Sequence, residues 1–185
     1  MIRKSPSRAE ILRAVVALAQ QRRDGRLTPR LPDGTAVVPG AFADELDLVG
    51  ALLLRWHARL SGHLERELAR HPLDRRAAVV RAWSRAAEES AGLRLIVDQY
   101  LAHPVDARMA QALRRAQAKE RAHLAVAAGL AGGEGPAAVE AGARLESAAR
   151  AAAPALPTPQ PMQAAAPGTP DQGSLVARIK AVLAA

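Results

Sequence analysis

An apolar stripe with the spacing of an α-helix runs along residues 46–68. Its members recur at steps of three and four residues: Leu46, Val49, Leu53, Trp56, Leu60, Leu64 and Leu68. About six turns of helix with one apolar face must be covered by other elements. The 185 residues include one Phe, one Tyr and two Trp but 44 Ala, and β-sandwiches and barrels draw on aromatic and β-branched residues. The sequence therefore predicts an all-α fold.

Further helical patterns on both sides of this stripe predict a bundle of about five helices over residues 1–131. A capping-box pattern at Ser7 and Glu10 precedes the first helix. The expected segments are 8–24, 42–70, one from Asp74 to a break at Gly92, the nearly all-apolar 93–101, and 106–130. Between the first two, residues 26–39 carry three prolines and predict a short hairpin-like insertion.

The two tryptophans, Trp56 and Trp83, fall on the apolar faces of their expected helices. We therefore expect both to lie in the core. A buried indole N–H needs a hydrogen-bond acceptor, for which a nearby His or Glu is suitable.

The composition changes after residue 131 and divides the rest of the chain into three parts. Residues 132–153 begin with a Gly-rich break and continue as an Ala-rich, weakly amphipathic helix. Residues 154–173 contain six prolines, which exclude helix and sheet and predict a flexible linker. Residues 174–185 regain a helical pattern, so we expect an amphipathic docking helix there.

The expected docking helix has one apolar face and two cations off that face. The apolar positions are Leu175, Val176, Ile179, Val182 and Leu183, and the cations are Arg178 and Lys180. A Pro-rich linker before a short amphipathic helix is similar to the encapsulation peptides of bacterial microcompartment proteins. This resemblance implies that the helix binds a protein partner. The alternative is that it folds back onto its own domain.

The net charge of +8 is compatible with nucleic-acid binding, which we keep as an alternative function. From about residue 42 onward, the expected helix lengths are broadly similar to those of TetR-like regulators. A DNA-associated transcriptional regulator needs a helix-turn-helix, however, and residues 26–39 carry Pro29, Pro32 and Pro39 where its second helix would lie. No motif supports this alternative.

The motifs of catalysis and metal binding are missing from the sequence. There is no cysteine, no nucleophile elbow and no phosphate-binding loop. Glu120 and His123 have the E-x-x-H spacing of ferritin-like di-iron proteins, but no second copy of the pair completes such a site. We therefore expect no catalytic residue, no cofactor and no metal. A helical metal-binding protein or oxidoreductase is the third-ranked function.

Neither a signal peptide nor a membrane-spanning run is apparent, so we expect a cytoplasmic protein. Taken with the docking helix, these features predict a non-catalytic adaptor that binds a protein partner through residues 174–185. These features are also compatible with a homo-oligomer.

Overall fold

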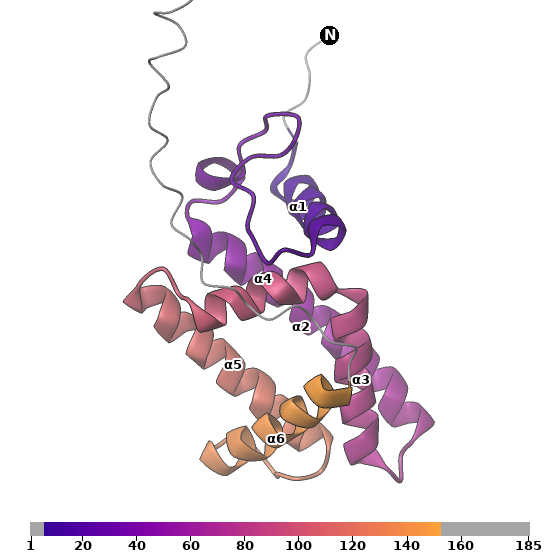
Figure 1. Ribbon diagram of the computed structural model, residues 1–185. Coiled ribbons are helices and arrows are strands. Elements are labelled where there is room, and N and C mark those ends of the chain that lie inside the picture. The colour runs from indigo at the N-terminus through magenta and orange to yellow at the C-terminus, as the bar shows by residue number, and fades with distance from the viewer. Residues whose placement is uncertain (1–5, 153–185) are drawn as a thin grey trace, which may run out of the picture.

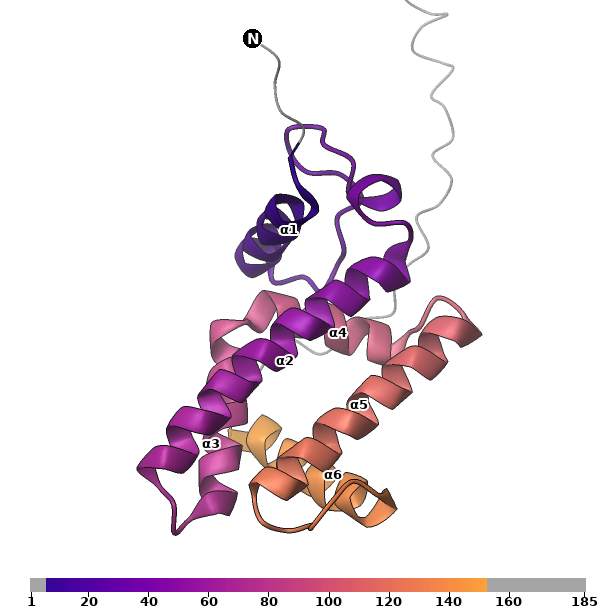
Figure 2. The same ribbon diagram turned by 180° about the vertical axis from the view of Figure 1, so that it is seen from behind.

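The computed structural model describes residues 6–152, which form six α-helices and one short irregular turn (Figures 1 and 2). The elements are α1 (Arg8–Arg22), η1 (Val37–Ala41), α2 (Glu45–Arg70), α3 (Arg75–Glu89), α4 (Ala91–Ala102), α5 (Ala107–Ala127) and α6 (Pro136–Ala152). No strand occurs within this range. The predicted all-α fold is confirmed, with five of these helices before residue 131.

Four helices begin at a polar side chain that caps their first turn. Ser7 accepts a hydrogen bond from the Glu10 N–H, and the Glu10 carboxylate accepts one from the Ser7 N–H, so the predicted capping box is present. Asp44, Asp74 and Asp106 each accept a bond from the N–H three residues later. These caps satisfy backbone donors that a helix leaves free at its start.

The segment between α1 and α2 is a looped insertion, as the prolines predict. Arg30 and Ala36 form a single antiparallel bridge, and the Gly34 N–H donates to the Leu31 carbonyl across the turn. In η1, Val38, Pro39 and Gly40 have non-helical backbone angles, and the Val38–Pro39 peptide is cis. This segment contributes no recognition helix of a helix-turn-helix.

The helices are arranged around α2, the longest of them. Helix α3 folds back along α2, and α5 and α6 form a second antiparallel pair, with α6 also packed on α3. Helix α1 packs against α4 at the end of the molecule opposite α6 (Figure 1). Seen from behind, α2 and α5 run diagonally on the near side, and α4 crosses behind α2 (Figure 2).

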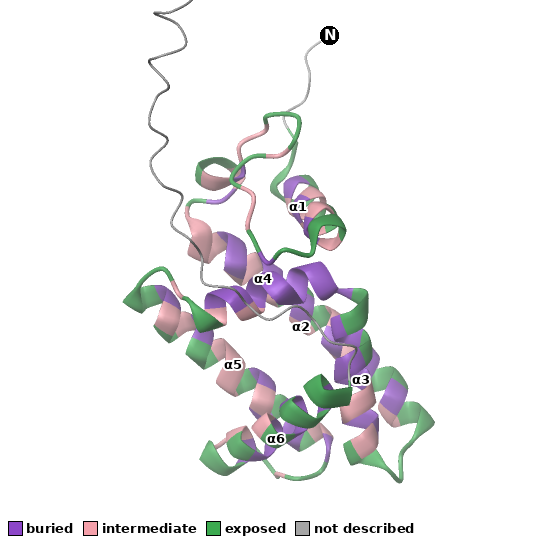
Figure 3. Ribbon diagram, in the orientation of Figure 1, coloured by how far each residue is buried: buried purple, intermediate pink, exposed green. Residues whose placement is uncertain are grey.

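One core cluster receives side chains from all six helices. Trp56 and Trp83 are 0% and 1% exposed, which confirms their predicted place in the core. Every residue from 91 to 97 is buried, so α4 is nearly continuous in purple in Figure 3. Its nearly all-apolar sequence is explained by this central position.

Only part of the apolar stripe of α2 faces the core. Val49, Trp56, Leu60 and Leu64 are buried, but Leu46, Leu53 and Leu68 are only half-buried. Leu48 and Leu52, which lie beside the stripe, are completely buried instead. Helix α2 therefore carries an apolar surface wider than its core contact.

Gly92 does not break the chain between two helices, contrary to the prediction. Helix α3 ends at Glu89, and Gly92 lies inside the first turn of α4. A Cβ atom at Gly92 would lie 2.1 Å from the Ala19 carbonyl oxygen of α1. Only glycine fits at this position, because the backbones of α1 and α4 are in contact there.

Residues 136–152 pack into the same unit as the preceding helices. Helix α6 buries Leu145 and Ala149 in the main core. Ala138 and Ala141 pack on Ala122 and Ala125 of α5 in a smaller cluster. The packed unit therefore continues beyond residue 131. Within the described range, every helix is too short or too polar to cross a membrane.

Candidate functional site

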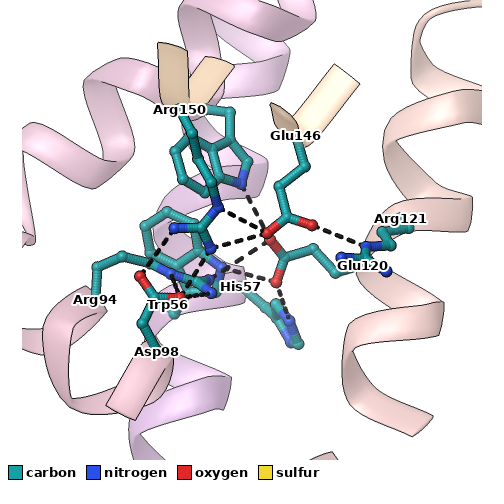
Figure 4. Close-up of polar contacts among 9 residues, drawn as sticks. Trp56, His57, Arg94, Asp98, Glu120, Arg121, Glu146 and Arg150 are labelled. Carbon is teal, nitrogen blue, oxygen red and sulfur yellow. Dashed lines mark hydrogen bonds and ion pairs between the residues drawn. The ribbon is translucent and has the colours of Figure 1, made fainter. Parts of the chain in front are cut away.

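A buried carboxylate, that of Glu120 on α5, lies at the centre of the bundle (Figure 4). Its Oε2 accepts a hydrogen bond from Trp56 Nε1 at 2.9 Å, and its Oε1 accepts one from Trp83 Nε1 at 3.1 Å. The two indole rings meet edge to face with their centroids 5.7 Å apart. One carboxylate thus satisfies both buried indoles, and the acceptor, expected to be a His or a Glu, is Glu120.

His57 on α2 is the third group against Glu120, with its Nε2 3.2 Å from Oε2. The imidazole must carry its proton on Nε2 to donate to this carboxylate. Ser61 lies one turn later on the same helix and also faces the groove described below. No hydrogen bond joins it to His57 in the described structure. Ser61, His57 and Glu120 therefore do not form a nucleophile–base–carboxylate relay.

A guanidinium, that of Arg94 on α4, lies against both indoles and is 1% exposed. Its central carbon is 4.9 Å from the ring centre of Trp56 and 5.6 Å from that of Trp83. It forms an ion pair with Asp98 at 2.6 Å and lies 3.7 Å from Glu120. Contact with aromatic faces and two carboxylates stabilises a cation at this depth.

The ionic cluster continues from α4 to α6. Arg150 of α6 lies 2.8 Å from Asp98 and 2.8 Å from Glu146. Glu146 also binds Arg121 of α5 at 2.8 Å. The cluster therefore ties α4, α5 and α6 together, and its three guanidiniums match three carboxylates.

Charge compensation keeps these carboxylates ionised. Burial opposes ionisation of Glu120, but the His57 hydrogen bond, the Arg94 charge and the Trp83 N–H lower its pKa to about 2. Burial likewise opposes ionisation of Asp98, and Arg94 and Arg150 lower its pKa to about 2. A general acid or base works best with a pKa near the ambient pH. Neither carboxylate meets that condition at neutral pH, and what the cluster shows directly is a set of ion pairs that connect α4, α5 and α6.

A groove of about 770 Å³ lies between α2 and α5, beside this cluster. His57 and Glu120 line it. Its other lining residues are mainly apolar or small on α2 and α5, with charged groups at the edges: Arg8, Leu46, Asp47, Gly50, Ala51, Leu53, Leu54, Leu60, Ser61, Ala112, Leu113, Arg115, Ala116, Lys119, His123 and Glu134. This size falls within the range of small-molecule sites.

The residues singled out from the sequence are only partly within the described structure. The expected partner-binding residues Leu175, Val176, Arg178, Ile179, Lys180, Val182 and Leu183 lie outside it. Glu120 is buried while His123 is exposed, and both line the groove between α2 and α5. Within residues 6–152, no group of three or more His, Asp or Glu side chains is placed to hold a metal ion.

Sequence reasoning did not find the ionic cluster. Its signal was present, because Arg94 and Asp98 interrupt an otherwise apolar helix. Charged residues in a buried segment need partners. The partners come from helices far along the chain, and helical spacing gives no information about them.

Comparisons of the chain with protein-family models, with curated proteins and with solved structures find no match. A functional conclusion therefore has to come from the residues themselves.

Proposed function

We propose that this protein is a non-catalytic helical adaptor that binds a protein partner through residues 174–185. The observation that supports this most is the separation of two parts of the chain. Within residues 6–152, the core of the bundle is built from α1 to α6, and its last member in sequence is Ala149. The amphipathic pattern of residues 174–185 comes only after a stretch with six prolines.

The chemistry of residues 174–185 favours docking as a helix into a partner's groove. Leu175, Val176, Ile179, Val182 and Leu183 share one helical face. Burial of each such side chain is worth about 1.5–3 kcal/mol before ordering costs, so the partner must cover several of them. Twelve residues make a marginal helix in water, so we expect the helix to form on binding.

The body of the protein provides a rigid carrier for this segment. The ionic cluster around Glu120 and Arg94 links α2, α3, α4, α5 and α6. The charged groups of the cluster form ion pairs with one another. This supports a role for the bundle in holding and presenting the binding segment rather than in turnover.

Affinity capture from the source cells tests this function, with three baits compared by quantitative mass spectrometry. The baits are the full chain, a deletion of 174–185, and Ile179→Asp. We expect a set of proteins captured by the full chain to be lost with both variants. The matched control is Arg178→Gln with Lys180→Gln, which leaves the apolar face intact and should retain capture with slower association.

Thermal melting of the same proteins supplies the decisive structural control. We expect the deletion of 174–185 to leave the Tm of the bundle nearly unchanged. A Tm lowered by many degrees would mean that the segment packs on its own bundle. Capture that is unaffected by Ile179→Asp would also overturn the proposal.

A further inference from the structure

The groove between α2 and α5 has two long walls of different chemistry. On α2, the wall is made by Leu46, Leu53, Leu54 and Leu60. Leu54 is 73% exposed, and it is one of few large apolar side chains so open in the described structure. On α5, the apolar part of the wall is made by Ala112, Leu113 and Ala116, and exposed cations lie beside them.

The cations of the α5 wall are Arg115 and Lys119, one helical turn apart on the same face. Neither forms an ion pair within the described residues. They differ from Arg8 at the end of the groove, which is bound to Asp47 at 2.6 Å. Arg115 and Lys119 are thus available to an external anion.

The acidic groups at the groove offset only part of this pair. Glu120 at its floor is compensated by Arg94 and receives both indole N–H groups. Glu134, from the segment after α5, also lines the groove and forms no ion pair within the described residues. His57 faces Glu120. Two unpaired cations against one unpaired carboxylate leave the groove with a net positive charge, and both cations lie on one turn of α5.

We propose that this groove binds a single-chain amphiphile with one anionic head group. The chain lies along the α2 leucines, and the carboxylate or phosphate head lies at Arg115 and Lys119. This site is separate from residues 174–185, and it goes beyond the adaptor function.

The charges at the groove favour an anionic ligand over residues 174–185 of this chain. That segment carries Arg178 and Lys180, which Arg115 and Lys119 would repel. The lining on α2 runs from Leu46 to Ser61, a rise of about 22 Å at 1.5 Å per residue. An extended twelve-carbon chain fits within this length.

Isothermal titration calorimetry of the full chain tests the proposal, with dodecanoate and dodecyl phosphate as probes below their micellar concentrations. We expect saturable one-to-one binding of at least one of them, and the comparison identifies the preferred head group. Dodecanol should bind more weakly, and dodecyltrimethylammonium should not bind measurably. Equal binding of all four probes would show a nonspecific apolar surface and overturn the proposal.

Head-group recognition is tested by Arg115→Gln with Lys119→Gln. Loss of two solvent-exposed charge contacts should weaken binding of the anionic probe about tenfold and leave dodecanol binding unchanged. The matched control is Arg66→Gln with Arg114→Gln, which removes two exposed cations that do not line the groove. An equal loss in both double variants would show only a general charge effect and would overturn the assignment.

Occupation of the groove is tested by Gly50→Leu. A Cβ atom at Gly50 meets no atom within 4 Å, so a leucine there fills the groove without disturbing the bundle. We expect binding to be abolished while the Tm is retained. Binding at wild-type strength would place the probe elsewhere and refute the site.

The chain without residues 174–185 should bind the anionic probe with the affinity of the full chain. Binding at least tenfold tighter after the deletion would show that this segment occupies the groove, which would overturn the amphiphile site in the intact protein. This result does not depend on whether the segment captures a protein partner.

Discussion

At the scale of single residues, the two tryptophans show how one carboxylate shapes the core. Trp56 and Trp83 both donate to Glu120, and both are buried. Their position was predictable from helical spacing, and so was the need for an acceptor. The sequence did not indicate that one acceptor serves both indoles, because that depends on the meeting of α2, α3 and α5.

We expect Trp56→Ala to lower the free energy of unfolding by about 3–5 kcal/mol, through loss of buried surface and the cavity left behind. Trp56→Phe keeps most of the bulk but removes one donor from a buried carboxylate, so its cost should be about 1–3 kcal/mol. Urea unfolding measures both values. A Trp56→Ala protein as stable as the wild type would be inconsistent with the core described here.

The buried carboxylates predict a loss of stability in acid. The pKa of Glu120 is lowered from 4.5 to about 2, and that of Asp98 from 3.8 to about 2. A carboxyl with a lowered pKa in the folded state stabilises the fold above its unfolded pKa, and this stabilisation is lost as the pH falls to the folded value. Glu120 should therefore contribute on the order of 3 kcal/mol that disappears between pH 4.5 and pH 2, and Asp98 on the order of 2 kcal/mol that disappears between pH 3.8 and pH 2.

The variant that isolates this effect is Glu120→Gln. It should be less stable than the wild type at pH 7, because Arg94 loses a carboxylate, and its stability should fall less steeply between pH 4.5 and pH 2. Unfolding by urea at a series of pH values measures the slope. Glu88→Gln, at an exposed carboxyl group, serves as the control. Identical slopes for the wild type and Glu120→Gln would exclude Glu120 as a source of the acid sensitivity.

At the scale of helices, the sequence predicted elements better than contacts. Helix α1 was expected over 8–24 and covers Arg8–Arg22. A capping box marks its start, and its end comes two residues before the expected one because Arg23 takes the left-handed conformation. Gly92 was misread because a glycine that ends a helix and a glycine that lets two helices touch look alike in one sequence. Which role applies depends on the neighbouring backbone, here that of Ala19.

Glycines at helix crossings give a prediction with an internal control. A Cβ atom at Gly142 would lie 1.8 Å from the Arg121 carbonyl oxygen, whereas one at Gly62 would lie 3.4 Å from the end of the flexible Arg66 side chain. We expect Gly142→Ala to destabilise by about 1–3 kcal/mol, because α5 and α6 must move apart. Gly62→Ala should instead stabilise by about 0.5–1 kcal/mol through helix propensity. Thermal melts of both variants compare them, and destabilisation of equal size at both sites would contradict the close crossing.

At the scale of the whole molecule, α6 is where sequence patterns carried the least information. Residues 136–152 are rich in alanine, with Val139 and Leu145 as the only large apolar side chains. Glu146 and Arg150 resemble the polar residues of a solvated helix face. In the structure, both belong to the ionic cluster with Asp98 and Arg121. Attachment of α6 therefore depends on charges matched across distant helices and on close alanine packing, which helical periodicity does not detect.

Two truncations separate the contribution of α6 from that of the residues after it. A protein ending at residue 152 keeps every contact described here, so its Tm should stay within a few degrees of that of the full chain.

A protein ending at residue 131 loses Arg150 and Glu146 and uncovers Ala122 and Ala125. It leaves Asp98 with one guanidinium instead of two. Removing a partner from a buried ion pair costs about 3–5 kcal/mol, which corresponds to a Tm lower by about 6–20 °C for a chain of this size. Differential scanning calorimetry of the two truncations and the full chain measures the difference. Equal melting of the two truncations would show that α6 and its charged groups contribute nothing measurable to the stability of the bundle.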